Sequence, residues 1–231
     1  MPLILNIETA TEVCSVALAS EGKLISIRES HSGFAHSENI TVFIDEVIKE
    51  AGTSLNALDA ISVSKGPGSY TGLRIGVSTA KGLCFALDKP LIAVPTLQAL
   101  TLGLINKFSI FNFQFSIIFC PILDARRMEV YCAVYDSELN EVEATSAKII
   151  EESSFRNLLD SNTIYFFGSG AAKCKSIINH PNTIFIEDVF ASASSMISLS
   201  EKLFNEKKFE DAAYFEPFYL KDFVAGASAK L

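Results

Sequence analysis

The sequence lacks the cysteine and histidine patterns that build disulfide frameworks and many metal sites. Its five cysteines, at positions 14, 84, 120, 132 and 174, form no CxxC pair, and only three histidines are present. The first residues, MPLILNIETAT, contain no basic segment of the kind that opens a signal peptide, and Glu8 comes early. We therefore expect free thiols and a reducing, cytoplasmic location.

The chain also lacks an excess of positive charge and a long unbroken apolar run. Its net charge is −8, which argues against strong nucleic-acid binding by this chain alone, because such binding requires Lys and Arg to neutralise phosphates. The most apolar segment, residues 108–123, is too short to span a membrane and is interrupted by Asn112 and Gln114. We expect it to be a buried strand, and we expect no membrane partner. Hydrophobic residues make up 49% of the chain, enough for a sizeable core.

What is present is an alternation of strand and helix patterns. In the first half, alternating or apolar runs predict strands and helical spacing predicts helices, with Ser37 as a candidate N-cap and Gly52 as a candidate helix stop. In chain order the expected elements are strands 3–8, 14–20 and 23–30, helix 37–52, strand 60–64, helix 71–87 and strand 90–95.

The second half repeats this plan more loosely. The expected elements are strands 116–125, 128–136 and 141–151, helix 153–160, strand 163–168, helix 171–179, strand 183–188 and helix 192–208. A duplicated βββαβαβ lobe is typical of the actin-like α/β fold, which consists of two ribonuclease-H-like lobes. We expect a first lobe at 1–103 and a smaller second lobe at 104–231 that includes the terminal helix. Fold alone does not give function.

A glycine-rich segment, KGPGSYTGLRIG at 65–76, joins one of these strands to a helix. It matches neither the Walker A loop nor the Rossmann fingerprint. We expect Gly66 to Gly68 to form a tight turn and Ser69 or Thr71 to cap the helix. Gly72, Gly76 and Ala80 follow at helical spacing. Because glycine inside a helix costs about 1 kcal/mol relative to alanine, another backbone should approach closely there, from this chain or from a partner.

Several segments together carry a family resemblance. LNIET at the start, SKGPGSYTGLRIGVSTAKGL at 64–83, KPLIAVPTL at 89–97, LDARRMEVY at 123–131 and EPFYL at 216–220 resemble the TsaB (YeaZ) family. The resemblance implies a non-catalytic subunit of the bacterial machinery that makes N6-threonylcarbamoyladenosine (t6A) at position 37 of tRNAs reading ANN codons. The implied partners are the catalytic paralogue TsaD and the ATPase TsaE, with tRNA bound only through the complex.

We expect the first lobe to associate through helices 37–51 and 71–87. Two such helices from each of two chains would form a four-helix packing, either in a homodimer or with the paralogue, and small residues would let the backbones close in. The residues expected at this interface are Ile40, Ile44, Val47, Gly72, Ile75, Gly76, Thr79, Ala80 and Leu83.

A catalytic metal is not expected. In the paralogue an Asn-His-x-x-x-His helix start binds a metal, and the resemblance places Pro95, Thr96 and Leu100 at those three positions. Neither Thr96 nor Leu100 can replace a histidine ligand. We expect the histidines at 31, 36 and 180 to be surface loop residues.

Two segments are candidates for nucleotide binding. Thr9 and Thr11 lie on the first turn, where actin-like folds contact phosphates, beside Glu8 and Glu12, whose carboxylates are possible Mg²⁺ partners. Gly168 and Gly170 precede a short helix, as in a phosphate turn. A plain polar hairpin and a plain strand-to-helix turn explain both segments as well. We expect no resident cofactor, and at most weak ATP or ADP binding at the complex interface.

Two alternatives stay open at this stage. Asp124 of the segment DARRMEVY either forms an ion pair with one of the arginines of that segment, Arg126 or Arg127, or leaves both arginines to contact tRNA or a partner. The chain as a whole is either the scaffold described above or an enzyme of actin-like fold, such as an ATP-dependent kinase or carbamoyl transferase, or a peptidase-like protein.

Overall fold

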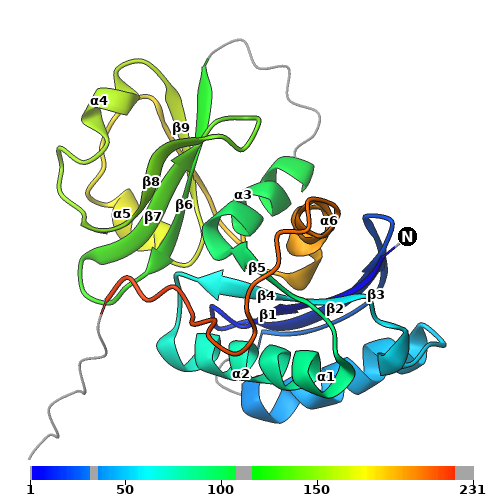
Figure 1. The fold of residues 1–231 in the computed structure, drawn as a ribbon. Coiled ribbons are helices and arrows are strands. Elements are labelled where there is room, and N and C mark those ends of the chain that lie inside the picture. Colours follow the sequence, from blue (N-terminus) through cyan, green and yellow to red (C-terminus); the bar gives the residue numbers. More distant parts are fainter. Residues whose placement is uncertain (1, 32–35, 108–115, 222–231) are drawn as a thin grey trace, which may run out of the picture.

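The computed structural model describes residues 2–31, 36–107 and 116–221, and contains two five-stranded sheets (Figure 1). The first sheet comprises β1 (Leu3–Glu8), β2 (Cys14–Ser20), β3 (Lys23–Ser30), β4 (Ala60–Gly66) and β5 (Leu91–Pro95). The second comprises β6 (Ile117–Asp124), β7 (Glu129–Tyr135), β8 (Glu141–Ile149), β9 (Thr163–Phe167) and β10 (Thr183–Ile186). The α-helices are α1 (His36–Glu50), α2 (Tyr70–Leu87), α3 (Thr96–Lys107), α4 (Arg156–Leu159), α5 (Ala171–Lys175) and α6 (Ile197–Asn205). Short 3₁₀ turns are η1 (Leu55–Ala57) and η2 (Ala193–Met196).

The two sheets have the same topology, which confirms the predicted duplication. The first runs β3-β2-β1-β4-β5 and the second β8-β7-β6-β9-β10. In each, the first three strands form an antiparallel meander and the last two add in parallel through helical connections. Parallel neighbours require such crossovers, which explains why helices follow the third and fourth strands. The chain is therefore an α/β protein of two ribonuclease-H-like lobes.

The first sheet is covered on both faces, so its central strands read as almost continuous apolar runs. Helices α1 and α2 cover one face, where Leu5, Val63 and Val77 belong to one buried cluster. The opposite face packs against α6 and η2 through Ile4, Ile92 and Met196. The predicted helix stop at Gly52 is confirmed, since this glycine has φ +62 just after α1. The Ser37 cap is wrong, because the helix already includes His36.

The helix α3 was absent from the sequence prediction and lies between the two lobes (Figure 1). Leu97, Leu100 and Leu104 join a buried cluster with Phe119 and Phe167 of the second sheet, and α3 also contacts η2 and β4. The far face of the second sheet is covered by the short helices α4 and α5. From one side to the other the layers are α1 and α2, first sheet, α3 and α6, second sheet, α4 and α5.

After the second sheet the chain returns to the first lobe with α6 and the segment that follows it, and its last described residue, Lys221, pairs with Glu129 of the second sheet. The helix α6 packs mainly on β5 and β1. Residues 206–221 then cross the first lobe as a strap: Glu210 N donates to Leu91 O, and Phe218 N donates to Lys65 O at 2.7 Å. The boundary at 103/104 stays a prediction, and it falls inside α3, which contacts both lobes.

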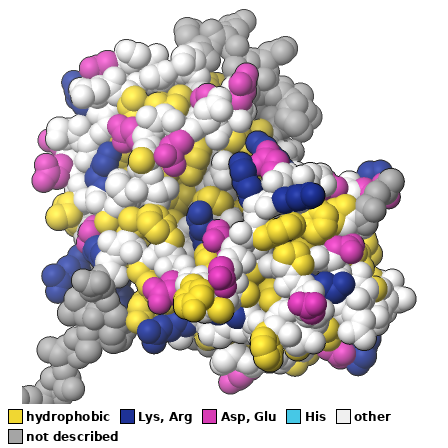
Figure 2. All heavy atoms as spheres, viewed as in Figure 1, with side chains coloured by type: hydrophobic (Ala, Val, Ile, Leu, Met, Phe, Trp, Pro, Cys, Tyr) yellow, Lys and Arg dark blue, Asp and Glu magenta, His cyan; other side chains and the backbone are white. Residues whose placement is uncertain are grey.

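The part of the predicted buried strand at 117–124 is confirmed as β6, whereas residues 108–115 lie outside the described residues. No helix in the described ranges is long and apolar enough to cross a membrane. On the face seen in Figure 2, charged side chains of both signs are interspersed with apolar patches.

Candidate functional site

The glycine segment lies against the first turn of the chain, the hairpin Thr9–Val13 between β1 and β2. A Cβ atom on Gly72 would overlap Thr9 O, and one on Gly76 would overlap Thr9 Oγ1. Thr9 is fully buried, and its hydroxyl donates to Gly72 O at 2.8 Å. Ser69 is the N-cap of α2, accepting from Gly72 N. The close backbone approach is therefore confirmed at Gly72, whereas Gly76 is approached by the Thr9 side chain, and both contacts occur within the lobe.

Most of the residues predicted for the association face are buried by the lobe itself, and their role in binding a partner stays a prediction. Six of the nine residues are buried in the first lobe's own core and cannot touch a partner in this conformation, namely Ile40, Ile44, Val47, Gly72, Gly76 and Ala80. The remaining three, Ile75, Thr79 and Leu83, are half-buried. The periodicity correctly identified a face that packs closely, but that face covers the sheet and the first turn.

A buried carboxylate ends β1 directly beneath this contact. Glu8 has no exposed surface, and its Oε1 accepts from Ala10 N at 2.6 Å and from Ser64 Oγ at 2.9 Å. Its Oε2 has no hydrogen-bond partner among the described residues. Burial raises the pKa of Glu8 from 4.5 to about 7, against the lowering effect of these hydrogen bonds. Burial and the neighbouring Glu8 charge also raise the pKa of Cys14 to about 11.

Most of the residues considered for nucleotide binding make close contacts within the chain itself. Thr9 is sealed as described, whereas Thr11 is half-buried and its hydroxyl accepts from Val13 N. Gly168 has φ +95, and a Cβ atom there would lie 2.6 Å from Ile122 O. Gly170 N donates to the same carbonyl at 2.9 Å. These glycines allow the loop after β9 to pack on β6, which explains them without a ligand. A nucleotide role for the four residues stays a prediction.

The two positions aligned with the paralogue's histidines are built into the core. Thr96 is fully buried and its hydroxyl accepts from Gly66 N at 3.1 Å, while Leu100 is 2% exposed. In the described ranges no group of three or more His, Cys, Asp or Glu side chains lies together in a geometry that could hold a metal. The surface-loop prediction is wrong for His36, which is buried in α1 with Nε2 2.7 Å from Thr11 O.

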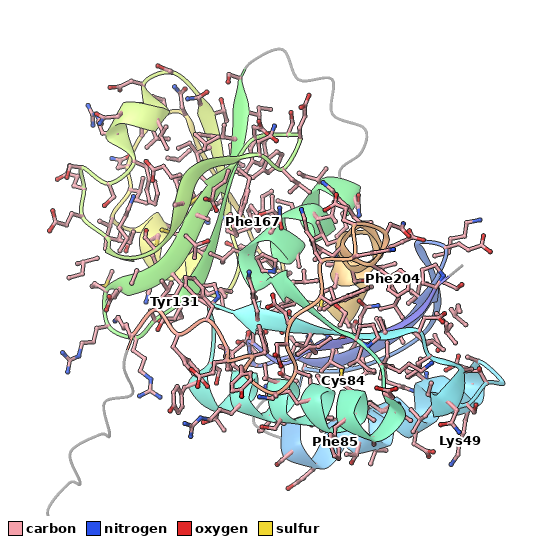
Figure 3. All side chains as sticks on the ribbon, viewed as in Figure 1. Lys49, Cys84, Phe85, Tyr131, Phe167 and Phe204 are labelled. Atoms are coloured by element: carbon pink, nitrogen blue, oxygen red, sulfur yellow. The ribbon has the colours of Figure 1, made fainter. Side chains whose placement is uncertain are left out.

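The outer face of α2 is unusually poor in charge for an 18-residue helix at the surface. Its exposed residues are Thr71, Arg74, Ser78, Gly82, Phe85 and Ala86. Phe85 is 92% exposed and points away from the sheet, whereas its neighbour Cys84 points into the lobe (Figure 3). Lys81, the helix's other cation, is held by the strap carbonyls of Ala213 and Phe215. Surface helices ordinarily carry charges on the outer face, so this face resembles an association surface.

Sequence comparisons identify relatives over nearly the whole chain. A family model described as "TsaD: tRNA N6-adenosine threonylcarbamoyltransferase" matches residues 30–228. The tRNA threonylcarbamoyladenosine biosynthesis protein TsaB of Escherichia coli is 30% identical over 228 residues, covering 96% of each chain. A tRNA N6-adenosine threonylcarbamoyltransferase of Staphylococcus saprophyticus is 40% identical over 108 residues, but this match covers only 40% of the present chain and 32% of that protein.

Comparison with solved structures points to the same family. A Pseudomonas aeruginosa protein described as similar to peptidase YEAZ superposes with a TM-score of 0.84 at 25% identity, covering 96% of this chain and all of that one. An activator of 2-hydroxyisocaproyl-CoA dehydratase from Clostridium difficile, with bound ADPNP, shares the actin-like fold at a TM-score of 0.50 and 10% identity, covering 89% of this chain and 96% of that one. The duplicated lobes, the glycine-rich α2 and the extent of the sequence match together show that the chain belongs to the TsaB family of tRNA threonylcarbamoyladenosine biosynthesis proteins.

Proposed function

We propose that this chain is a non-catalytic scaffold subunit in the synthesis of t6A in tRNA, and that it acts by binding the catalytic paralogue TsaD. The ATPase TsaE joins the pair, and tRNA reading ANN codons is engaged only by the complex. In isolation the chain forms a homodimer through the same surface, so that homodimer and heterodimer exclude each other.

The observation that carries the proposal is the charge-poor outer face of α2, where Arg74 is the one charged residue among those exposed. Phe85 is almost fully solvated, and half-buried Ile75, Thr79 and Leu83 flank the exposed row. Exposing a large aromatic side chain on a charge-poor helix is unfavourable for an isolated surface and favourable at an interface, where aromatic residues are enriched. The paralogue is a suitable occupant because it shares sequence with part of this chain, and related lobes present related helices to one another.

The non-catalytic role is supported by what occupies the catalytic positions of the paralogue. The Thr96 hydroxyl is used to bind Gly66 N, and Leu100 fills the core between the lobes. The Leu100 side chain has no donor atom for a metal, and the Thr96 hydroxyl could reach one only by giving up Gly66 N and unpacking α3. The first turn, where an actin-like kinase would bind phosphate, is closed by the contact between Thr9 and Gly72.

The test is t6A formation in a reconstituted system from which each subunit is omitted in turn, with modified nucleoside quantified by mass spectrometry. We expect no t6A from this chain alone, little or none from the paralogue without this chain, and turnover when both and the ATPase are present. Turnover by this chain without the paralogue would contradict the scaffold role and favour the enzyme alternative.

A further inference from the structure

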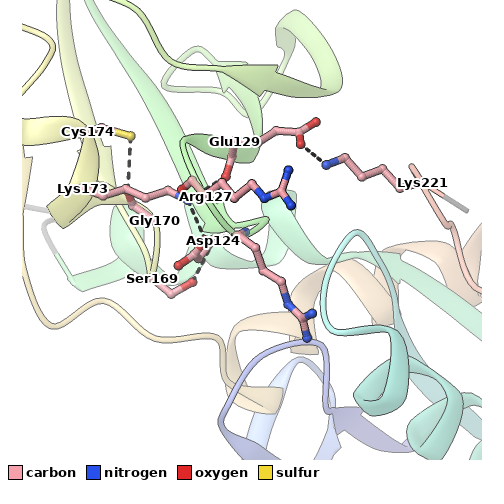
Figure 4. Close-up of polar contacts among 9 residues, drawn as sticks. Asp124, Arg127, Glu129, Ser169, Gly170, Lys173, Cys174 and Lys221 are labelled. Carbon is pink, nitrogen blue, oxygen red and sulfur yellow. Dashed lines mark hydrogen bonds and ion pairs between the residues drawn. The ribbon is translucent and has the colours of Figure 1, made fainter. Parts of the chain in front are cut away.

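The hairpin between β6 and β7 carries two adjacent exposed arginines, Arg126 and Arg127, whose guanidinium groups have no ion pair among the described residues. The nearby carboxylates are already occupied (Figure 4). Lys173 Nζ lies 2.6 Å from Asp124 Oδ1, and Lys221 pairs with Glu129. The sequence alternative of an Asp124–arginine pair is therefore wrong, and the hairpin retains two uncompensated positive charges on a chain whose net charge is −8.

The backbone of this hairpin is an uncommon place for arginine. Arg126 has φ +70 and Arg127 has φ +52, and this left-handed region favours Gly, Asn and Asp. Neighbouring contacts fix the turn: Asp124 Oδ1 accepts from Arg126 N at 2.7 Å, and Lys173 Nζ donates to Arg127 O at 2.9 Å and to Glu129 O at 2.7 Å. Sparsely populated backbone conformations that the surroundings hold in place occur preferentially at functional sites.

The side chains at these positions point to an anionic ligand with several oxygens. A guanidinium presents a planar set of donors that matches the oxygens of a phosphate, and two adjacent guanidinium groups on a fixed turn can bind one phosphate or two neighbouring ones. An acidic protein segment offers similar charge. Nucleic-acid phosphate is favoured, because the chain belongs to a family of tRNA biosynthesis proteins and because exposed, hydrated arginines are typical of backbone contacts to nucleic acid.

We propose that Arg126 and Arg127 bind the sugar–phosphate backbone of tRNA when this chain is assembled with the paralogue. The proposal rests on the proposed function, since the acidic chain alone repels RNA. The hairpin adds a local positive contact that fixes the position of the tRNA and reads no base. Lys173 is a positioning residue, because it orders the turn through Asp124 and two carbonyls without facing the ligand.

The test measures tRNA binding by the assembled complex at several salt concentrations, with the double variant Arg126→Asn/Arg127→Gly. Asparagine and glycine suit the left-handed backbone, so the thermal midpoint should stay the same or rise while the two charges are lost. We expect affinity to fall about tenfold at physiological salt, and the slope of log K against log salt to decrease in magnitude by about one to two.

The matched control is Lys207→Gly/Lys208→Asn, at the end of α6. It removes the same charge from an adjacent basic pair, and Lys207 also has a positive φ, of +54. We expect the control to leave affinity and slope close to those of the unaltered complex. A second variant, Arg126→Lys/Arg127→Lys, keeps the charge and should retain most of the salt slope.

The outcomes separate this proposal from the proposed function. If the unaltered proteins fail to assemble, the scaffold role is contradicted, and this proposal falls with it. If they assemble and the arginine variant binds tRNA as the lysine control does, only the hairpin proposal is overturned. If the arginine variant instead loses the paralogue in sedimentation, the arginines contact protein, and the RNA assignment is wrong.

Discussion

The first hairpins of the two lobes occupy the same place in the same topology but have opposite environments. In the first lobe β1 ends at Glu8, which is fully buried, and Thr9 is sealed beneath α2. In the second lobe β6 ends at Asp124, which is exposed and paired with Lys173, and the following turn presents two arginines to solvent.

The difference follows from the helix after the fourth strand of each sheet. The helix α2 has 18 residues and begins with glycines that let it lie directly on the first turn. The helix α5 has only 5 residues, and its Lys173 reaches the second turn through a side chain. A shared topology therefore does not determine which turn is available for binding. The length and the small residues of the covering helix decide it.

The largest effect is expected from opening the first lobe's seal. Gly76→Arg would place a side chain where a Cβ atom already overlaps Thr9, and would bury an unpaired charge. The cost is several kcal/mol, a large part of the 5–15 kcal/mol that stabilises a typical protein. We expect loss of the folded first lobe, measured as a lowered midpoint in denaturant unfolding followed by circular dichroism.

Gly82→Arg on the same helix is the matched control. No atom lies within 4 Å of a Cβ atom there, and the position is exposed. Because arginine has a higher helix propensity than glycine, we expect no loss and a gain of up to about 1 kcal/mol. A folded, fully stable Gly76→Arg protein would show that α2 does not seal the first turn, and would return its glycine face to the list of association surfaces.

A smaller effect on stability is expected to distinguish the two carboxylates at the strand ends, Glu8 of β1 and Asp124 of β6. Because the pKa of Glu8 is about 7 when folded and 4.5 ordinarily, the unfolded chain loses its proton first as pH rises. Stability should therefore fall between pH 4.5 and pH 7, by about 3 kcal/mol in all. Glu8→Gln should remove this part of the pH dependence. The free energy of unfolding of the variant, measured in urea, should therefore rise relative to that of the natural protein between pH 5 and pH 8.

Asp124→Asn is the corresponding change in the second lobe. The change breaks an exposed ion pair with Lys173, and such pairs usually contribute about 0–1 kcal/mol to stability. The asparagine side chain keeps an oxygen that can accept from Arg126 N.

If Glu8→Gln and the natural protein lost stability in parallel between pH 5 and pH 8, the Glu8 carboxyl would not be buried in its neutral form.

The sequence predicted the duplicated succession of strands along the chain because apolar runs and turn residues mark strands locally. It also identified the close-packed face of α2, since Gly72 and Gly76 recur at helical spacing. It did not identify what that face packs against, because Thr9 lies more than sixty residues away in the chain and no local pattern links the two segments. Phe85, on the opposite face, was overlooked because a single apolar residue gives no periodic signal.

The helix α3 escaped prediction for a related reason. Thr96–Lys107 is apolar on several sides, since it packs between the two sheets, and such a segment lacks the polar stripe that marks a surface helix. The sequence singles out the arginine hairpin but leaves the partner of Asp124 open. Lys173, which pairs with Asp124, lies in the helix α5, 49 residues further along the chain. Side-chain pairing between a helix and a distant strand end is a tertiary property that neither composition nor spacing specifies.

The most direct test of the scaffold role is binding of the catalytic paralogue to Phe85→Glu and to Ile149→Glu, measured by sedimentation and pull-down. Both positions are exposed apolar residues, 92% on α2 and 65% on β8, so neither change should lower the thermal midpoint of the monomer. We predict that Phe85→Glu loses the complex, because a charge on the outer face of α2 must be desolvated at the interface, and that Ile149→Glu keeps it. Equal binding by the two variants would contradict association through α2.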